Sequence, residues 1–471
     1  MHSGHVRSYP RGAEGLCGSS IRLGFTNPLD RGHAHQVGRK NPAAGLPSDA
    51  QDEGNMKELQ VMFKAGGRSL RLGTLADDGK DILFQYSSDA IASAIEFSPI
   101  RLPLRPQAYP DQQNNYLHLM RVPGIVYDAL PDGWGLVLMD RRMRAKGIDT
   151  ATISVLDRLA YLGENTMGAL TFEPADRAMA EVRDLTIFDM ASEIRELLHD
   201  DSRVVLAELA IAGGSPGGVR PKAVAFYNPE TDQMSTHEWR VPGGHPWLFK
   251  FPTKEDARFS CALEELYARM SDRCNLGMEP TKFIQLPDGL TAFGTRRFDR
   301  YAAGQRVHVH SLAGLLHANF RLPSLGYVDF IRATRLLTRD NREIVKALQR
   351  CLFNVVMNNR DDHAKNFAFM LNEQNEWRLA PPYDLTYAPG FRGEHFTEVG
   401  GEGKAPGRAH ILTVARAGGL KDGAAEVLID SMLATLTVAA FRQEAARLPI
   451  PAHVIDQVAK VMEANRQRLV K

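Results

Sequence analysis

Apolar positions in the middle of the chain change their spacing, which predicts a helix followed by a hairpin. Over residues 344–355 the apolar side chains return every three or four positions, as on one face of a helix. Residues 367–371 are continuously apolar, and residues 377–380 follow a polar turn, so two short paired strands are expected. The polar loop 358–366 and the segment after the second strand therefore lie at neighbouring ends of a hairpin.

This loop and segment carry residues typical of phosphoryl transfer. Asp361 and Asn366 have the Asp-x-x-x-x-Asn spacing in which the aspartate accepts the proton of the attacking hydroxyl and the asparagine holds Mg²⁺. Asp384, beyond the hairpin, is the candidate main magnesium ligand. Lys365 could neutralise charge on the transferring group. The alternative is a loop with ordinary capping residues, so the interpretation needs a nucleotide-binding half upstream.

A small-residue stretch upstream is the candidate phosphate-binding loop. Glycine lets backbone amides approach phosphates without a Cβ in the way. The spacing matches neither the P-loop nor the dinucleotide fingerprint, so an ordinary hairpin loop is the alternative. A strand is expected directly after it, over residues 222–227. The candidate phosphate-contacting positions are Gly213, Gly214, Ser215, Gly217 and Gly218.

A second upstream strand, residues 247–251, carries Lys250 between aromatic side chains. Glu264 follows in a predicted helix, where it can orient Lys250, as the strand lysine and helix glutamate do in protein kinases. The alternatives are a snorkelling edge lysine and a solvated glutamate.

Together these segments resemble the HipA family, the kinase toxins of bacterial toxin–antitoxin pairs. The resemblance implies an ATP- and Mg²⁺-dependent serine/threonine protein kinase. By this resemblance Asp361 corresponds to the family's catalytic aspartate, Asn366 and Asp384 to its Mg²⁺ ligands, and Lys250 to its phosphate-binding lysine. The matching segments, in the family's order, are residues 130–135 (Leu-Pro-Asp-Gly-Trp-Gly), 297–300 (Arg-Phe-Asp-Arg), 361–367 (Asp-Asp-His-Ala-Lys-Asn-Phe) and 379–385 (Leu-Ala-Pro-Pro-Tyr-Asp-Leu).

The hinge and the glycine-rich loop both depart from the family pattern. Arg297 and Phe298 stand where the family's hinge contacts adenine, but Arg296 replaces the usual glutamate. Adenine recognition is therefore expected to use backbone groups. The best-known members carry an autophosphorylated serine that switches the kinase off, and Ala210 stands in its place. Self-inactivation is then either absent or moved to Ser215.

The expected fold class is α+β: a kinase-like two-lobed fold with an added β-rich N-terminal subdomain and an all-α C-terminal lobe. Residues 59–86 read as a strand meander. Residues 1–55 show no periodicity, and the resemblance begins near Met56. They are expected to be a disordered tail or to precede the true start. The expected domains are residues 57–170 (N-terminal subdomain), 171–300 (nucleotide-binding N-lobe) and 301–471 (catalytic C-lobe).

Composition adds little specificity. The 57 Lys and Arg balance 56 Asp and Glu, so no long-range attraction to nucleic acid or to an anionic membrane is expected. The four cysteines show no metal-like clustering, which favours reduced core thiols in a cytoplasmic protein. His308 and His310 alternate on a strand, where core or surface placement is favoured over metal ligation. No signal peptide or membrane span is expected.

The resemblance also implies partners. These are a protein substrate, with an aminoacyl-tRNA synthetase as the family's best-known target, and a helix-turn-helix antitoxin through which DNA is reached indirectly. Two other hypotheses stay open: a nucleotide-binding pseudokinase that acts as a regulatory partner of the antitoxin, and a small-molecule kinase. The substitutions at Ala210 and Arg296 motivate the first, whereas the intact Asp361, Asn366 and Asp384 favour an active enzyme.

Overall fold

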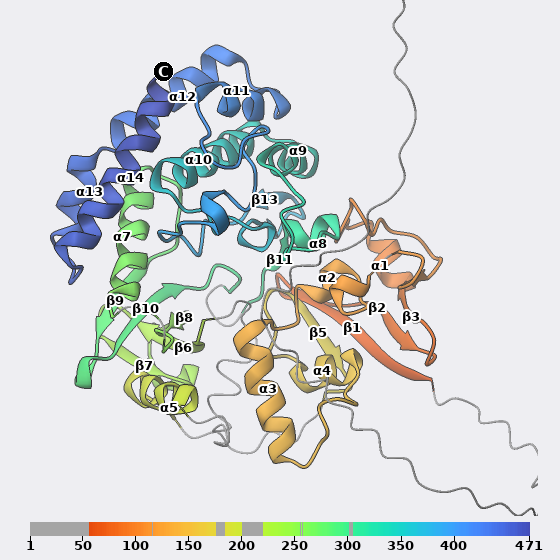
Figure 1. Ribbon diagram of the computed structural model, residues 1–471. Coiled ribbons are helices and arrows are strands. Elements are labelled where there is room, and N and C mark those ends of the chain that lie inside the picture. The colour runs from red at the N-terminus through yellow and green to blue at the C-terminus, as the bar shows by residue number, and fades with distance from the viewer. Residues whose placement is uncertain are drawn as a thin grey trace, which may run out of the picture. The chain divides into compact units, whose positions relative to one another are not determined.

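The computed structural model of the 471-residue chain describes residues 56–114, 116–175, 184–199, 220–254, 256, 258–300 and 305–471. They belong to a compact unit that begins at Gly54 and ends at Lys471 (Figure 1). The predictions for residues 1–55 and for the glycine-rich loop at 213–218 lie outside the described residues. The predicted domain boundaries stay predictions.

The N-terminal domain (residues 56–175) is built on an antiparallel sheet with the strand order β4-β3-β2-β1-β5. Leu59, Val61 and Phe63 alternate with more exposed positions along β1, so one face of the strand enters the core. The expected meander is confirmed. Its elements are β1 Lys57–Ala65, β2 Arg68–Asp77, β3 Ile82–Tyr86, α1 Ser88–Ser93, β4 Tyr109–Pro110, α2 Gly124–Tyr127, α3 Gly133–Ala145, α4 Val155–Leu162 and β5 Leu170–Glu173.

The N-lobe (residues 184–199 and 220–300) contains a five-stranded antiparallel sheet with the order β7-β6-β8-β10-β9. Helix α5 packs on it through Ile194 and Leu197, which share a core with Trp247 and Phe249. The strands expected around Lys222 and Lys250 are confirmed as β6 and β8. The elements are α5 Ile187–His199, β6 Lys222–Asn228, β7 Gln233–Ser235, β8 His245–Lys250, α7 Ser260–Arg273, β9 Thr281–Gln285 and β10 Thr291–Arg296.

The C-lobe (residues 305–471) is mainly helical and also holds a three-stranded sheet, β11-β12-β13, so it is not all-α in the strict sense. The apolar stripe of α10 is buried, which confirms the expected helix. The elements are β11 His308–Ser311, α8 Leu312–Leu316, α9 Tyr327–Thr338, α10 Asn341–Met357, β12 Ala368–Leu371, β13 Trp377–Leu379, α11 Arg408–Ala417, α12 Asp422–Thr435, α13 Val438–Ala445 and α14 Ala452–Val470.

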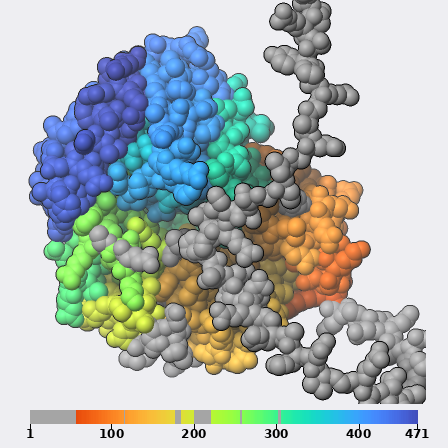
Figure 2. Space-filling view, viewed as in Figure 1, coloured from red at the N-terminus to blue at the C-terminus, as the bar shows by residue number. Residues whose placement is uncertain are grey.

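Helices α2 and α8 bring the N-terminal domain and the C-lobe into backbone contact (Figure 1). A Cβ added to Gly124 would lie 1.9 Å from the carbonyl oxygen of Gly314, so the approach requires glycine there. Within the described ranges no single helix is both long and apolar enough to span a membrane; only α12 with α13, which are bent by 42°, reach that length and composition as a pair. Figure 2 shows the N-terminal domain (red to orange) and the C-lobe helices (blue) at opposite sides of the view.

Candidate active site

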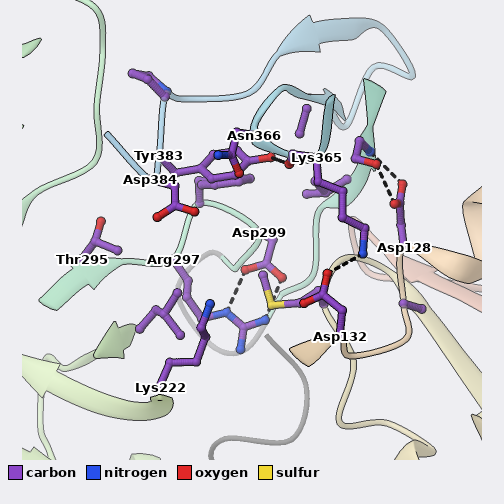
Figure 3. A pocket seen from close by; sticks show the side chains of 18 of the residues that line it. Asp128, Asp132, Lys222, Thr295, Arg297, Asp299, Lys365, Asn366, Tyr383 and Asp384 are labelled. Atoms are coloured by element: carbon purple, nitrogen blue, oxygen red, sulfur yellow. Dashed lines mark hydrogen bonds and ion pairs between the residues drawn. The ribbon is translucent and has the colours of Figure 1, made fainter. Parts of the chain in front are cut away.

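A pocket of about 450 Å³ lies where the N-terminal domain, the N-lobe and the C-lobe meet (Figure 3). Lys222 and Lys250 line it from the N-lobe, and Asn366 and Asp384 line it from the C-lobe. The N-terminal domain adds Asp128, Ala129, Leu130, Asp132 and Gly133. The pocket therefore brings together side chains that are far apart in the sequence.

Lys250 is held between two carboxylates. It donates a hydrogen bond to Glu264 of α7 and another, 2.6 Å long, to Oδ1 of Asp384. The lysine and Glu264 are both buried. The expected ion pair is therefore formed, and the alternatives of a snorkelling lysine and a solvated glutamate are wrong. A fixed ammonium group at this point of the pocket can contact an anionic ligand.

The charges at this point determine the protonation states. Burial alone would lower the pKa of Lys250, but the charges of Asp384 and Glu264 raise it well above its ordinary value. Burial alone would raise the pKa of Asp384, but Lys250 and Lys222 hold it well below its usual range. Asp384 also has a left-handed backbone, with φ of 58°, which is uncommon for a residue other than glycine. The site thus keeps an ionised carboxylate in a constrained position.

The loop after α10 presents Asp361 and Asn366 beside the pocket. Asn358 ends the helix in a left-handed conformation and turns the chain into the loop. Nδ2 of Asn366 donates a 2.7 Å hydrogen bond to the carbonyl of Asp361, which leaves its Oδ1 as the atom suited to a cation. Although Asp361 is exposed, surrounding protein desolvates it, and Asp384 and Asp362 add to the resulting rise in its pKa.

Arg297 and Phe298 also line the pocket, on the segment that joins the two lobes. The guanidinium of Arg297 donates two hydrogen bonds, of 2.8 and 2.7 Å, to Asp299. Phe298 stacks on Tyr383, with ring centroids 5.5 Å apart. Arg296 pairs with Glu279 at 2.7 Å. The side chain of Arg297 is therefore committed to Asp299.

Two family models match the chain over most of its length. Residues 64–173 match the HipA N-terminal domain, and residues 214–440 match the HipA-like C-terminal domain. The chain belongs to the HipA family.

A solved HipA-family structure shares the fold. It comes from the complex of HipA, HipB and operator DNA of the Shewanella oneidensis MR-1 toxin–antitoxin system. The TM-score is 0.65 at 18% identity, with 88% of this chain and 97% of that chain covered. This similarity confirms the expected kinase-like α+β fold.

Two curated relatives from Sinorhizobium fredii (strain NBRC 101917 / NGR234) carry the names "Putative kinase Y4mE" and "Putative kinase Y4dM". The first is 27% identical over 267 residues, which cover 51% of this chain and 59% of the relative. The second is 24% identical over 289 residues, which cover 56% of this chain and 62% of the relative. The chain thus spans about three fifths of the length of these relatives.

Sequence reasoning missed Lys222 in this HipA-family chain. Lys222 of β6 lies directly opposite Lys250 of β8 in the sheet register, so both lysines face the pocket. Burial and the neighbouring charge of Lys250 lower the pKa of Lys222 to about 8. The sequence places Lys222 at the start of a predicted strand, but it does not specify the pairing with β8 that gives Lys222 the same face as Lys250.

Asp362, beside Asp361, was also missed as a supporting residue. It is buried and accepts hydrogen bonds from the Tyr327 hydroxyl at 2.8 Å, from His395 at 2.8 Å and from the backbone N–H of Phe396 at 2.9 Å. These contacts anchor the loop to the C-lobe through the buried Asp362 side chain, so that Asp361 and Asn366 are held in position. Their partners come from α9 and from residues after Asp384, which sequence spacing does not reveal.

His308 and His310 lie in the core on β11. Nδ1 of His310 contacts Asp128 at 2.6 Å, and its Nε2 contacts Ser98 at 2.9 Å. Nε2 of His308 contacts the Phe97 carbonyl at 3.1 Å. Burial lowers the pKa of His308 to about 3, so this ring is neutral. Both histidines thus act in packing.

Proposed function

We propose that the chain is an ATP- and Mg²⁺-dependent serine/threonine protein kinase. One observation carries the proposal: Lys250 joins Glu264 of the N-lobe to Asp384 of the C-lobe in a pocket that Asn366 also lines. In kinases this lysine binds nucleotide phosphates, and the aspartate after the catalytic loop binds Mg²⁺. The kinase names of the two curated relatives support the same reaction class.

The donor set of the pocket fits magnesium. Asp384 offers a carboxylate, and Asn366 offers an amide oxygen, both hard ligands. Within the described ranges no group of three or more His, Cys, Asp and Glu side chains could hold a metal ion. Mg²⁺ suits such a sparse site, because it keeps several waters and takes further ligands from nucleotide phosphates. When bound, the ion would neutralise charge on those phosphates.

The residues of the site act by positioning and charge. Lys250, with Lys222 beside it, grips phosphate oxygens, and the loop at 213–218 is proposed to add backbone amides. Asp361 orients the acceptor hydroxyl and accepts its proton; the raised pKa makes it a better base than an ordinary aspartate. Lys365 supplies positive charge on the side of the loop that faces the N-terminal domain.

The family also suggests the biological setting. We propose a protein serine as the acceptor, with an aminoacyl-tRNA synthetase as the first substrate to test. The Shewanella oneidensis structure holds HipA together with HipB and operator DNA. A helix-turn-helix antitoxin is therefore the proposed partner in the cytoplasm, and DNA would be reached through it.

The test is incubation of the purified chain with γ-labelled ATP, Mg²⁺ and a cell extract. We expect labelled protein with wild type and phosphoserine or phosphothreonine after hydrolysis of the label. Asp361→Asn should lose about 10²- to 10⁴-fold of the transfer, because the base is gone. Asp430→Asn, an exposed carboxylate paired with Arg408, serves as the matched control and should transfer normally.

Three results would contradict the proposal. Nucleotide binding without any transfer would favour the pseudokinase hypothesis. Label on a small molecule in place of protein would select a small-molecule kinase. Equal transfer by wild type and Asp361→Asn would remove this loop from the chemistry.

A further inference from the structure

The segment Leu130–Gly135 of the N-terminal domain lies against the catalytic loop. Asp132 accepts a 2.8 Å hydrogen bond from the ammonium group of Lys365, which is 233 residues away in the sequence. The side chains are 9% and 13% exposed, so the ion pair is largely removed from water. Figure 3 shows Lys365 extending away from Asn366 towards Asp132.

Asp132 occupies the N-cap position of α3 but does not cap that helix. An aspartate at this position usually accepts a hydrogen bond from the second or third backbone N–H of the helix. Here the side chain makes no capping hydrogen bond, and its carboxylate goes to Lys365 instead. Asp132 therefore does not stabilise the start of α3 through its side chain and instead contacts Lys365 of the C-lobe.

Aromatic rings complete the setting of Lys365. Its ammonium nitrogen lies 4.5 Å from the ring centroid of Tyr127 and 4.7 Å from that of Phe320. Both distances are within the range of cation–π attraction. The contacts of its ammonium group with Tyr127 and Asp132 come from the N-terminal domain. The lysine of the catalytic loop is therefore fixed mainly from outside its own lobe.

The same segment also reaches the other lobe. The indole N–H of Trp134, two residues after Asp132, donates a 3.2 Å hydrogen bond to the carbonyl of Lys222. Lys222 is the pocket-lining residue opposite Lys250. One short segment thus bridges the catalytic loop and the sheet that carries the phosphate-side lysines.

Stability alone does not account for the ion pair. Burying two charges costs desolvation, and apolar side chains of similar volume usually stabilise a fold as well or better. In contrast, the position of Lys365 matters for the site. Its carbonyl accepts a 2.6 Å hydrogen bond from the Tyr383 hydroxyl, and Lys365 and Tyr383 directly precede Asn366 and Asp384. Holding Lys365 therefore holds the residues next to both proposed Mg²⁺ ligands.

We propose that Asp132 is a positioning residue for Lys365, so that the N-terminal domain completes the catalytic site of the kinase. The inference rests on the proposed function. It assigns a role to the Leu-Pro-Asp-Gly-Trp-Gly segment. Asp132 holds the catalytic loop in position through Lys365, and Trp134 holds β6 in position through the Lys222 carbonyl.

The test measures kcat and KM for ATP as ADP release from Mg²⁺·ATP, with the protein that the wild type labels in the cell extract as the acceptor. Asp132→Asn should lower kcat by about 10- to 100-fold, because a small misplacement of the loop is costly. KM for ATP should change by less than about threefold, since Lys250 and Glu264 are untouched. Asp132→Glu should recover most of the rate. Asp132→Ser, which keeps a good N-cap residue, should behave like Asp132→Asn and guards against a folding defect.

A double-mutant cycle separates positioning from mere structure. If Asp132 acts through Lys365, then Asp132→Asn should add less than about twofold to the loss seen in Lys365→Gln. The matched control is Asp140→Asn, which breaks an ion pair between α3 and Arg158 within the N-terminal domain. Its kcat should equal that of wild type.

The outcomes are distinguishable. An active wild type whose Asp132→Asn variant keeps full kcat, or whose double mutant loses rate additively, overturns this inference alone. A wild type that binds ATP and releases no ADP overturns the kinase proposal and the inference with it. A selective kcat loss, rescue by glutamate and a non-additive cycle support it.

Discussion

Two of the lysines that line the pocket, Lys250 and Lys365, are held by different parts of the protein. Lys250 pairs with Glu264 and Asp384, which belong to the two kinase lobes. Lys365 pairs with Asp132 and lies over the ring of Tyr127, both from the N-terminal domain. The first arrangement is what the kinase reaction itself requires. The second makes the catalytic loop dependent on a domain outside the two lobes.

The N-terminal domain can therefore influence a reaction whose chemistry lies in the two lobes. It touches the catalytic loop through Asp132 and the segment between the lobes through Gly168, whose N–H donates a 2.8 Å hydrogen bond to Asp299. Arg300 reaches back to the carbonyl of Thr166 at 2.7 Å. Any event that moves the domain would therefore be felt at the loop and at the hinge together.

Removing Lys250 should have the largest effect. Lys250→Met deletes the charge that contacts phosphates and leaves Glu264 buried without its partner. We expect kcat/KM for ATP to fall by about 10³-fold, as for loss of a main electrostatic contact. The free energy of unfolding should fall by roughly 3 kcal/mol, because a buried pair is broken. Initial-rate kinetics and urea unfolding measure the two. Normal ATP affinity in this variant would contradict the assignment.

Removing Lys365 should have a smaller and different effect. Lys365→Met should lower kcat by about 10²-fold while KM for ATP stays within about threefold, because the lysine lies on the loop side of the pocket. Full kinetics at saturating and limiting ATP separate the two constants. If KM rises as much as for Lys250→Met, the two lysines share one role and the comparison fails.

Asp299 provides a prediction about pH. Burial would raise its pKa, but Arg297 and Arg300 hold it well below the ordinary value. A lowered folded-state pKa gives stability that is present above the ordinary aspartate pKa and is lost as the pH falls through the folded value. Between pH 5 and pH 2.5, roughly, wild type should therefore lose on the order of 2 kcal/mol more than Asp299→Asn.

Urea unfolding at several pH values checks this. The Asp299→Asn variant should be the less stable protein at neutral pH, since Arg297 loses a buried partner. If the free energy of unfolding changed with pH in the same way for the two proteins, ionised Asp299 would not stabilise the hinge.

An exposed ion pair gives the smallest expected effect. Arg416 of α11 and Asp422 of α12 are 56% and 48% exposed and form an ion pair at 2.7 Å. Arg416→Gln should leave both the midpoint of urea unfolding and kcat unaltered, because solvent screens an exposed pair. A large loss of activity in Arg416→Gln would mean that the site responds to any surface change. The different effects expected for the Lys250 and Lys365 variants could then not be assigned to their positions in the pocket.

Local patterns predicted the helix and the hairpin that carry the C-lobe part of the candidate site. The buried stripe of α10 and the hairpin of β12 and β13 follow from apolar periodicity, because helices and strands repeat at 3.6 and 2 residues. Lys250 and Glu264 lie on adjacent elements, so their pairing could be inferred from a known kinase arrangement. The helix α11, Arg408–Ala417, follows a glycine-rich stretch and was not expected.

Long-range contacts could not be predicted in the same way. Asp132 and Lys365 are separated by more than two hundred residues, and no periodicity links them. Lys222 enters the pocket because β6 pairs with β8 in one register, which spacing along the chain does not specify. Asp362 is the sequence neighbour of Asp361, yet packing buries it and leaves Asp361 exposed. Such differences arise from tertiary packing alone.

Titration of a fluorescent ATP analogue into the purified chain, with Mg²⁺ and with EDTA, tests directly whether this pocket binds a magnesium–nucleotide complex. If Asp384 and Asn366 hold the ion against phosphates gripped by Lys250, wild type should bind more tightly with Mg²⁺. Asp384→Asn should abolish that gain, and Lys250→Met should weaken binding under both conditions. Binding that ignores both Mg²⁺ and these substitutions would place the nucleotide outside this pocket and contradict the account.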